Sequence, residues 1–263
     1  MMATDKRPVT LITGASAGIG MALARVFAAH GHELVLVARR EPPLAQLADE
    51  IAAGGHPRPH VLALDLGQPD AGARISEALG AQGLEVQFLV NNAGFGLAGP
   101  AAALDRREQL AMIDLNIRAL TDLSLAFVDA LARQRGGMLN VASVAAFLPG
   151  PGMAVYYASK AYVLSFSEAL HRELADRGVR VTVLCPGPVP TQFQARAGMT
   201  MKEFPRLLTR SAEQVAAEGY AGLMAGRRLV VPGLPNKGAT TLLRLLPRGL
   251  VLAIMGRRNK DRR

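Results

Sequence analysis

The strongest constraint on the fold is the regular alternation of short apolar runs with segments of helical periodicity. The apolar runs predict strands at residues 8–12, 33–37, 60–64, 86–90, 137–141, 179–184 and 229–231. Between them, helical segments are predicted at residues 18–30, 44–53, 75–80, 106–135, 154–177 and 212–225. Strands that alternate with helices pair in parallel through right-handed crossovers. The chain is therefore predicted to be an α/β protein with a doubly wound, Rossmann-type parallel sheet of about seven strands flanked by helices.

The formal net charge of +9 belongs to the C-terminal end of the chain. From Arg227 onward there are ten Lys or Arg residues and one acidic residue, Asp261, so the preceding part is neutral. A neutral body argues against a nucleic-acid-binding surface on the fold, and no nucleic-acid partner is expected. The chain divides into one Rossmann-fold domain, residues 1–232, and a basic amphipathic C-terminal extension, residues 233–263.

Cysteine and histidine usage argues against disulfides and metal sites. Cys185 is the only cysteine, which excludes an intrachain disulfide and a CxxC-type metal site. No metal-ligand spacing connects the scattered histidines His30, His32, His56, His60 and His171. The first ten residues lack the pattern of a signal sequence, and the apolar run 250–255 is too short to span a bilayer. A cytoplasmic protein without a bound metal is expected.

A glycine-rich turn joins the first predicted strand to the first predicted helix. Residues 13–20 have the sequence TGASAGIG. Glycine permits the tight turn, and it lets backbone N–H groups approach a pyrophosphate at the N-terminus of the helix. The dinucleotide contacts predicted here are Gly14, Ser16, Gly18, Ile19 and Gly20.

The end of the second predicted strand favours NADP(H) over NAD(H). An acidic residue at this position would bond the ribose 2′-hydroxyl of NAD, but the chain has Ala38, Arg39 and Arg40. Guanidinium groups suit a 2′-phosphate, and Arg39 is preferred, whereas Arg40 is equally well explained as a solvated loop residue. Further cofactor contacts are predicted at the next two strand ends, at Asp65, Leu66, Asn92, Ala93 and Gly94.

Up to about Val231 the sequence resembles the short-chain dehydrogenase/reductase family. The resemblance rests on ordered motifs: TGASAGIG, NNAG at residues 91–94, Asn116, Ser143, Y-x-x-x-K at residues 156–160, and PGPVPT at residues 186–191. It implies an NADP(H)-dependent oxidoreductase that transfers a hydride between the nicotinamide and a carbonyl or alcohol. It also implies a homodimer or homotetramer built through the two long helices. Ala17 departs from the pattern, because NADP-preferring relatives often carry a basic residue there, and phosphate recognition then depends more on Arg39.

The resemblance assigns roles to single residues. Tyr156 would be the general acid/base, and Ser143 would hydrogen-bond the substrate oxygen. Lys160 would hold the nicotinamide ribose and lower the pKa of Tyr156, and Asn116 would support a proton-relay water through a local break in its helix. The residues that would frame the nicotinamide are Pro186, Gly187, Val189 and Thr191.

Tyrosine chemistry supports the choice of Tyr156. A phenol with a pKa of about 10 is a poor base at neutral pH unless a neighbouring cation stabilises its phenolate. Tyr156 and Lys160 are four residues apart, hence on one helix face. Tyr157, three residues before Lys160, is the rival, but the family spacing favours Tyr156 and leaves Tyr157 a structural role.

Mostly apolar side chains are expected around the substrate. They are Phe95, Ala145, Phe147, Leu148, Met153, Phe193, Met199, Met201 and Phe204. This lining favours an apolar or aromatic ketone, aldehyde or secondary alcohol over a sugar phosphate. Residues 192–209 are expected to form a mobile lid over the pocket.

Three functions are compatible with the sequence. The leading one is a reductase or dehydrogenase of small carbonyl or alcohol substrates. The second is a membrane-associated reductase of long-chain keto lipids, because the C-terminal extension mixes leucines with arginines and would suit an anionic membrane surface. A helix packed on the subunit or its oligomer partner is the favoured explanation of that extension. The third is a non-catalytic NADP(H)-binding regulator, which the intact Asn116–Ser143–Tyr156–Lys160 set argues against.

Overall fold

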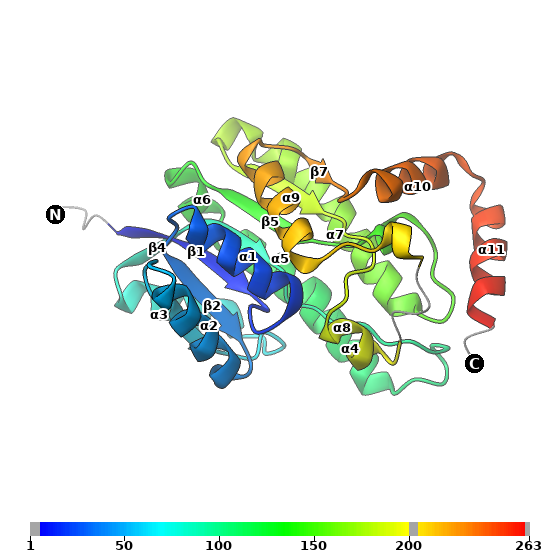
Figure 1. The fold of residues 1–263 in the computed structure, drawn as a ribbon, viewed down its shortest axis with the longest axis horizontal. Helices are drawn as coiled ribbons and strands as arrows, with labels where there is room; N and C mark the ends of the chain where they lie inside the picture. Colours follow the sequence, from blue (N-terminus) through cyan, green and yellow to red (C-terminus); the bar gives the residue numbers. More distant parts are fainter. Residues whose placement is uncertain (1–5, 200–204, 261–263) are drawn as a thin grey trace.

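The computed structural model describes residues 6–199 and 205–260, and it contains one seven-stranded sheet in which all neighbouring strands are parallel (Figure 1). The strand order is β3-β2-β1-β4-β5-β6-β7. The order changes direction between β1 and β4, which is the position where doubly wound sheets bind ligands. The predicted fold class is confirmed. The strands are β1 (Arg7–Thr13), β2 (Leu34–Ala38), β3 (His60–Ala63), β4 (Leu84–Asn91), β5 (Gly137–Val141), β6 (Arg180–Leu184) and β7 (Leu229–Val230).

Helices cover both faces of the sheet because its strands are apolar on both sides. In β1, Ile12 packs into a buried cluster with residues of α1, α2 and α9. Its neighbour Leu11 packs into the opposite cluster with residues of α3, α5, α6 and α7. The bounds of these helices are α1 (Gly18–Ala29), α2 (Glu41–Ala53), α3 (Ala71–Ala81), α5 (Leu120–Ala126), α6 (Val128–Arg133), α7 (Ala154–Glu173) and α9 (Ala212–Met224). The remaining elements are α4 (Arg106–Ile113), α8 (Gln192–Ala197), α10 (Leu234–Leu245), α11 (Arg248–Lys260) and the short segments η1 (Asp114–Ala119), η2 (Val144–Phe147), η3 (Ala175–Arg177) and η5 (Arg206–Leu208).

The single helix predicted over residues 106–135 is interrupted in the structure. It consists of α4, a six-residue π-helical segment η1, α5 and, after a break at Phe127, α6. The π-helical segment contains Asn116, at the place where a local break was expected. One-turn π-helical segments inside α-helices are frequent at functional sites because they change the direction in which side chains point.

The C-terminal extension forms two helices, of which α10 packs against the body of the protein. Asn236 and Thr240 of α10 are buried, and the amide of Asn236 donates hydrogen bonds of 3.0 Å to the carbonyl oxygens of Leu208 and Pro232. Beyond α10, α11 lies at the outer edge of the molecule (Figure 1). Within the described residues, no helix has the length and apolar character needed to cross a membrane.

Candidate active site

A cavity of about 1090 Å³ opens at the carboxyl ends of the central strands. The segments that follow β1, β2, β4, β5 and β6 all contribute to its lining, together with α7, α8 and the C-terminal helices. Of the predicted cofactor and catalytic residues, those that line it are Gly14, Ser16, Gly18, Ile19, Arg39, Arg40, Asp65, Leu66, Asn92, Ala93, Gly94, Ser143, Tyr156, Lys160, Pro186, Gly187, Val189 and Thr191. Of the predicted substrate residues, those that line it are Phe95, Ala145, Leu148, Met153, Phe193 and Met199.

Three predicted site residues lie behind the cavity wall. Gly20 is buried at the start of α1, and Asn116 is buried in η1. Phe147 packs against a cluster that includes Val163 and Leu164, because the short η2 helix turns its side chain away from the cavity. Met201 and Phe204 fall outside the described residues, as do positions 200–204 of the predicted lid.

The glycine turn after β1 is held in shape by Asn92. Its amide donates to the carbonyl oxygens of Thr13 at 2.9 Å and of Gly14 at 3.1 Å. A Cβ atom on Gly20 would overlap both that amide and the Gly14 carbonyl oxygen, so Gly20 allows α1 to approach the turn. Thr13, which the sequence reasoning missed, accepts hydrogen bonds from the backbone N–H groups of Asn92 and Ala93. These bonds join the ends of β1 and β4 below the cavity.

The same turn fits the phosphates of a dinucleotide. Gly14 and Gly18 have φ angles of +65° and +54°, a conformation that side chains disfavour, and a Cβ on Gly14 would lie 2.8 Å from the Cα of Ala93. In the described structure, no side chain caps the N-terminus of α1, whose N-cap residue is Ala17. The first N–H groups of a helix then remain available to an anion, and the helix dipole favours one.

Asn116 acts in this structure as a bridge between three segments. Its Oδ1 accepts from the backbone N–H of Phe95 at 3.1 Å. Its Nδ2 donates to the Phe95 carbonyl oxygen at 2.9 Å and to the hydroxyl of Ser159 at 3.1 Å. Asn116 thereby ties η1 to the segment after β4 and to α7, and α7 carries Tyr156. Ser159 had no sequence signal beyond its position three residues after Tyr156.

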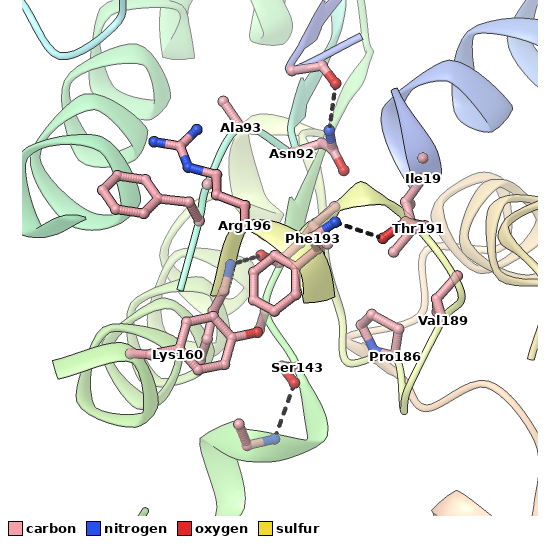
Figure 2. A pocket seen from close by; sticks show the side chains of 18 of the residues that line it. Ile19, Asn92, Ala93, Ser143, Lys160, Pro186, Val189, Thr191, Phe193 and Arg196 are labelled. Carbon is pink, nitrogen blue, oxygen red and sulfur yellow. Dashed lines mark hydrogen bonds between the residues drawn. The ribbon is translucent and has the colours of Figure 1, made fainter. Parts of the chain in front are cut away.

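Ser143, Tyr156 and Lys160 converge on one part of the cavity. Ser143 caps η2 by accepting a 3.1 Å hydrogen bond from Ala145, and it also hydrogen-bonds the phenol of Tyr156. The ammonium group of Lys160 lies 5.9 Å from the centre of the Tyr156 ring and donates to the Val141 carbonyl oxygen at 2.9 Å. In Figure 2, Lys160 lies at the left and Ser143 at the bottom, while Pro186 and Val189 lie across from Lys160 at the right.

Burial changes the pKa values of this group in opposite directions. It raises the pKa of Tyr156 above the usual range for a phenol, and the hydrogen bond to Ser143 only partly opposes this effect. It lowers the pKa of Lys160 to about 8. Lys160 was expected to lower the pKa of Tyr156, but in this structure burial raises that pKa and the ammonium group donates to the Val141 carbonyl oxygen. The phenol is therefore protonated at neutral pH.

Tyr157 also borders the cavity, but it packs as a structural residue would. A Cβ atom on Gly150 would overlap the Tyr157 ring, so the ring lies directly on the backbone of the η2–α7 connection. The rings of Tyr156 and Tyr157 meet edge to face, with centres 6.0 Å apart.

The segment after Thr191 covers the cavity with side chains of α8. Thr191 and Gln194 form a capping box that starts this helix. Phe193 lies 5.3 Å from Tyr156, measured between ring centres. Three residues along the same helix, the guanidinium of Arg196 lies 4.1 Å from the centre of the Phe95 ring. Arg196 was missed, although its spacing from Phe193 places both on one helix face.

The C-terminal helices supply a wall of the cavity that was not predicted from the sequence. Its residues are Asn236, Ala239, Thr240 and Leu243 of α10 and Met255 of α11. The spacing of the four α10 residues is that of a single helix face and was the available signal. Within the described residues, no group of three His, Cys, Asp or Glu side chains is arranged to hold a metal ion.

Comparison with known proteins identifies the family. The model of the short chain dehydrogenase family matches residues 8–202. The chain belongs to the short-chain dehydrogenase/reductase family of oxidoreductases. The match includes the glycine turn, Asn92, Ser143, Tyr156 and Lys160.

Individual members of the family show how widely their substrates range. The chain is 40% identical over 188 residues to sulfoacetaldehyde reductase 2 of Chromohalobacter salexigens, with 70% of this chain and 74% of that protein covered. A short-chain dehydrogenase of Sphingobium yanoikuyae, solved in complex with NADPH, superposes with a TM-score of 0.79 at 29% identity over 92% of this chain and 97% of that one. The bulky-bulky ketone specific alcohol dehydrogenase of Comamonas testosteroni superposes with a TM-score of 0.76 at 27% identity over 92% and 96%. Family membership thus leaves the substrate open.

Proposed function

We propose that the chain is a cytoplasmic NADP(H)-dependent reductase of apolar or aromatic ketones or aldehydes, with Tyr156 as its general acid/base. The observation that carries this proposal is the convergence of Tyr156, Ser143 and Lys160 in a cavity whose other end is lined by Arg39 and Arg40. A pure NADP(H)-binding regulator has no need for a partly buried tyrosine set against a serine and a lysine, which argues for catalysis.

The side chains support carbonyl reduction as follows. NADPH, when bound, supplies the hydride. Ser143 orients the carbonyl oxygen, and Tyr156 donates its phenolic proton to that oxygen as negative charge develops on it. The high pKa of Tyr156 keeps the proton on the phenol until that moment. Lys160 is the cation close enough to compensate the phenolate that remains. Asn116 contributes by positioning, since it fixes η1 against α7.

The preference for NADP(H) rests on Arg39 and Arg40. Both line the cavity directly after β2, and neither forms an ion pair with a carboxylate of the described residues. Guanidinium groups in this state are available to a 2′-phosphate, which they bind in bidentate fashion. The NADPH complex of the Sphingobium protein supports the same preference.

The apolar substrate class follows from the side chains around Tyr156. Met153, Phe193 and Met199 surround it in one apolar cluster. Methionine side chains adapt to ligands of varied shape, as a bulky ketone would require. The ketone specificity of the Comamonas protein supports this substrate class.

A membrane-associated reductase of long-chain keto lipids is the second candidate. Leu243 and Met255 line the cavity, whereas Leu250 and Leu252 on α11 are each 49% exposed beside a basic terminus. Co-sedimentation with anionic liposomes tests this candidate. Equal pelleting of the full chain and of a chain ending at Leu246 would refute it.

A homodimer or homotetramer would cover the apolar side chains exposed on α4, α5 and α7. They are Leu110, Ile113, Leu125 and Tyr162. Light scattering of the purified protein tests the assembly, and a monomer at micromolar concentration would refute it.

The experiment that tests the catalytic proposal measures loss of NADPH absorbance against a panel of ketones and aldehydes, with Tyr156→Phe and Tyr157→Phe as a matched pair. Tyr156→Phe removes only the acidic oxygen and should lower kcat by about 10²- to 10⁴-fold without changing the Kd of NADPH. Tyr157→Phe, which keeps the ring on Gly150, should retain most of the activity. If only Tyr157→Phe lost activity, Tyr157 would be the general acid/base and Tyr156 the structural residue.

A further inference from the structure

Arg196 places a positive charge on the helix that covers the cavity. It lines the cavity from α8, whereas Arg39 and Arg40 line it from the β2–α2 junction. Its side chain is exposed at the cavity mouth, and it forms no ion pair with a carboxylate of the described residues. The residues that the family model matches include this position.

Stacking fixes where this guanidinium points. Its central carbon lies 4.1 Å from the centre of the Phe95 ring, and Phe95 is only 5% exposed. Phe95 is itself held by Asn116 through both backbone hydrogen bonds. A guanidinium over an aromatic face gains cation–π attraction, and its planar edge remains available for hydrogen bonds. The Arg196 guanidinium is therefore held in one orientation with its N–H groups available to a ligand, and it does not rotate freely as a surface side chain would.

The Arg196 side chain points toward the part of the cavity that the cofactor would occupy. Figure 2 shows its side chain extending away from Ser143 and toward the side where Ala93 lies. Phe193, by contrast, lies over Tyr156 from the same helix. One face of α8 thus presents an apolar group to the reacting centre and a cation to the region near the end of β4.

The electrostatic environment of Arg196 indicates an anionic ligand. Burial and then the positive charge of Arg39 lower the pKa of Arg196, and the negative charge of Glu108 only partly compensates. Two guanidinium groups that line one cavity and are close enough to interact repel each other unless an anion lies between them. An anion that contacts both would remove this repulsion and draw α8 toward the sheet.

We propose that Arg196 is a cofactor-binding residue that contacts a phosphate group of the bound nicotinamide dinucleotide from α8, in the cavity that Arg39 also lines. This inference rests on the proposed function, because it requires that the cavity bind NADP(H). Cofactor binding would then hold α8, and Phe193 with it, in place over the reacting centre before the substrate reacts. The phosphate is either the 2′-phosphate or the pyrophosphate, and the two are distinguished by comparing NADPH with NADH.

The test is the Kd of NADPH and of NADH, measured by nucleotide fluorescence with the full-length protein. The variants are Arg196→Gln, Arg196→Lys and the control Arg206→Gln, an exposed arginine of η5 that does not line the cavity. We expect Arg196→Gln to weaken NADPH binding by about tenfold, as loss of one charge-assisted hydrogen bond predicts. Arg196→Lys, which keeps the charge but not the planar stacking, should lose less.

Comparing the Kd values of NADPH and NADH shows which phosphate group Arg196 contacts. A loss confined to NADPH assigns Arg196 to the 2′-phosphate, and an equal loss for NADPH and NADH assigns it to the pyrophosphate. Unchanged Kd values for both nucleotides in a correctly folded Arg196→Gln protein would overturn the proposal. Failure of the wild-type chain to bind NADPH at all would instead overturn the proposed function.

Discussion

Two asparagines, Asn92 and Asn236, make the same kind of bridge in the two halves of the cavity. Each side-chain amide donates to two backbone carbonyl oxygens: Asn92 to Thr13 and Gly14, and Asn236 to Leu208 and Pro232. The bridge of Asn92 joins two central strands of the sheet, whereas that of Asn236 joins a C-terminal helix to the η5 turn. Each half is therefore fixed by side-chain-to-backbone bonds, but only the first is built on the sheet.

The consequence is a division between a rigid cofactor half and a substrate half held by helices. The cofactor half is fixed by the ends of paired strands, where glycine conformations leave room for a ligand. Apart from Arg196, the substrate half is made of side chains on α8, α10 and α11, which contact the sheet through loops and short helices. Elements with few contacts to the core open and close at lower free-energy cost. We expect changes in the two halves to alter different quantities.

The largest effect is predicted for Asn92→Ala. The change leaves the carbonyl oxygens of Thr13 and Gly14 without their amide partner and destabilises the glycine turn. We expect the free energy of unfolding to fall by about 2–3 kcal/mol, at roughly 1–1.5 kcal/mol for each lost hydrogen bond. NADPH binding should weaken at least about tenfold for the same reason. Urea denaturation and nucleotide fluorescence measure the two quantities. Unchanged NADPH affinity would show that the turn does not depend on this bridge.

A smaller and different effect is predicted for Asn236→Ala. The change detaches α10 from Leu208 and leaves the glycine turn intact, so the Kd of NADPH should stay within about twofold of wild type. The KM of a bulky ketone should rise by about five- to tenfold, since about 1–1.4 kcal/mol of positioning is lost. Steady-state kinetics at saturating NADPH provide the measurement. Parallel losses of NADPH and ketone affinity would contradict the division into two halves.

The sheet and the cofactor half were predictable from the sequence because both depend on local pattern. Strand–helix alternation fixes the order of elements, and the residues at strand ends then meet at one edge of the sheet. Gly14, Arg39 and Asn92 line the cavity as a result. The residues that follow a strand can be identified from the local sequence, without knowledge of how distant segments pack.

The substrate half was less predictable because it depends on how separate helices pack. Phe147 was expected in the pocket, but the η2 turn directs it into a neighbouring cluster. Leu243 and Met255 were not expected there, because the sequence does not state where α10 and α11 pack. Asn116 carried a family signal, yet its hydrogen bonds to Phe95 and Ser159 depend on a π-helical turn. Composition alone does not locate such turns.

Lys160 lies where the two halves meet and predicts a pH dependence of cofactor binding. Burial lowers its pKa to about 8, and a bound polyanion favours the protonated form and so raises that pKa. Protonation and NADPH binding then assist each other, so affinity is highest below about pH 8 and falls as the pH rises through it. A shift of one pKa unit limits the fall to about tenfold. Fluorescence titrations between about pH 6.5 and pH 9.5 measure this dependence, and Lys160→Met should bind weakly with little change in this range.

The smallest effect is predicted for Leu243→Ala, with Leu242→Ala as its neighbour on the same helix. Leu243 lines the cavity, whereas Leu242 is 59% exposed, so the pair compares the same truncation inside and outside the substrate half. Losing part of the apolar contact between a substrate and one large side chain costs roughly 0.7–1.4 kcal/mol, on the scale of about 0.8 kcal/mol per buried methylene. We therefore expect Leu243→Ala to raise the KM of a bulky ketone by about three- to tenfold while leaving that of a small aldehyde nearly unchanged, because only the larger substrate reaches α10. Leu242→Ala should change neither value. Equal effects of the two variants on KM would mean that α10 acts only through the stability of the protein, and the wall formed by the C-terminal helices would then lie outside the region that the substrate occupies.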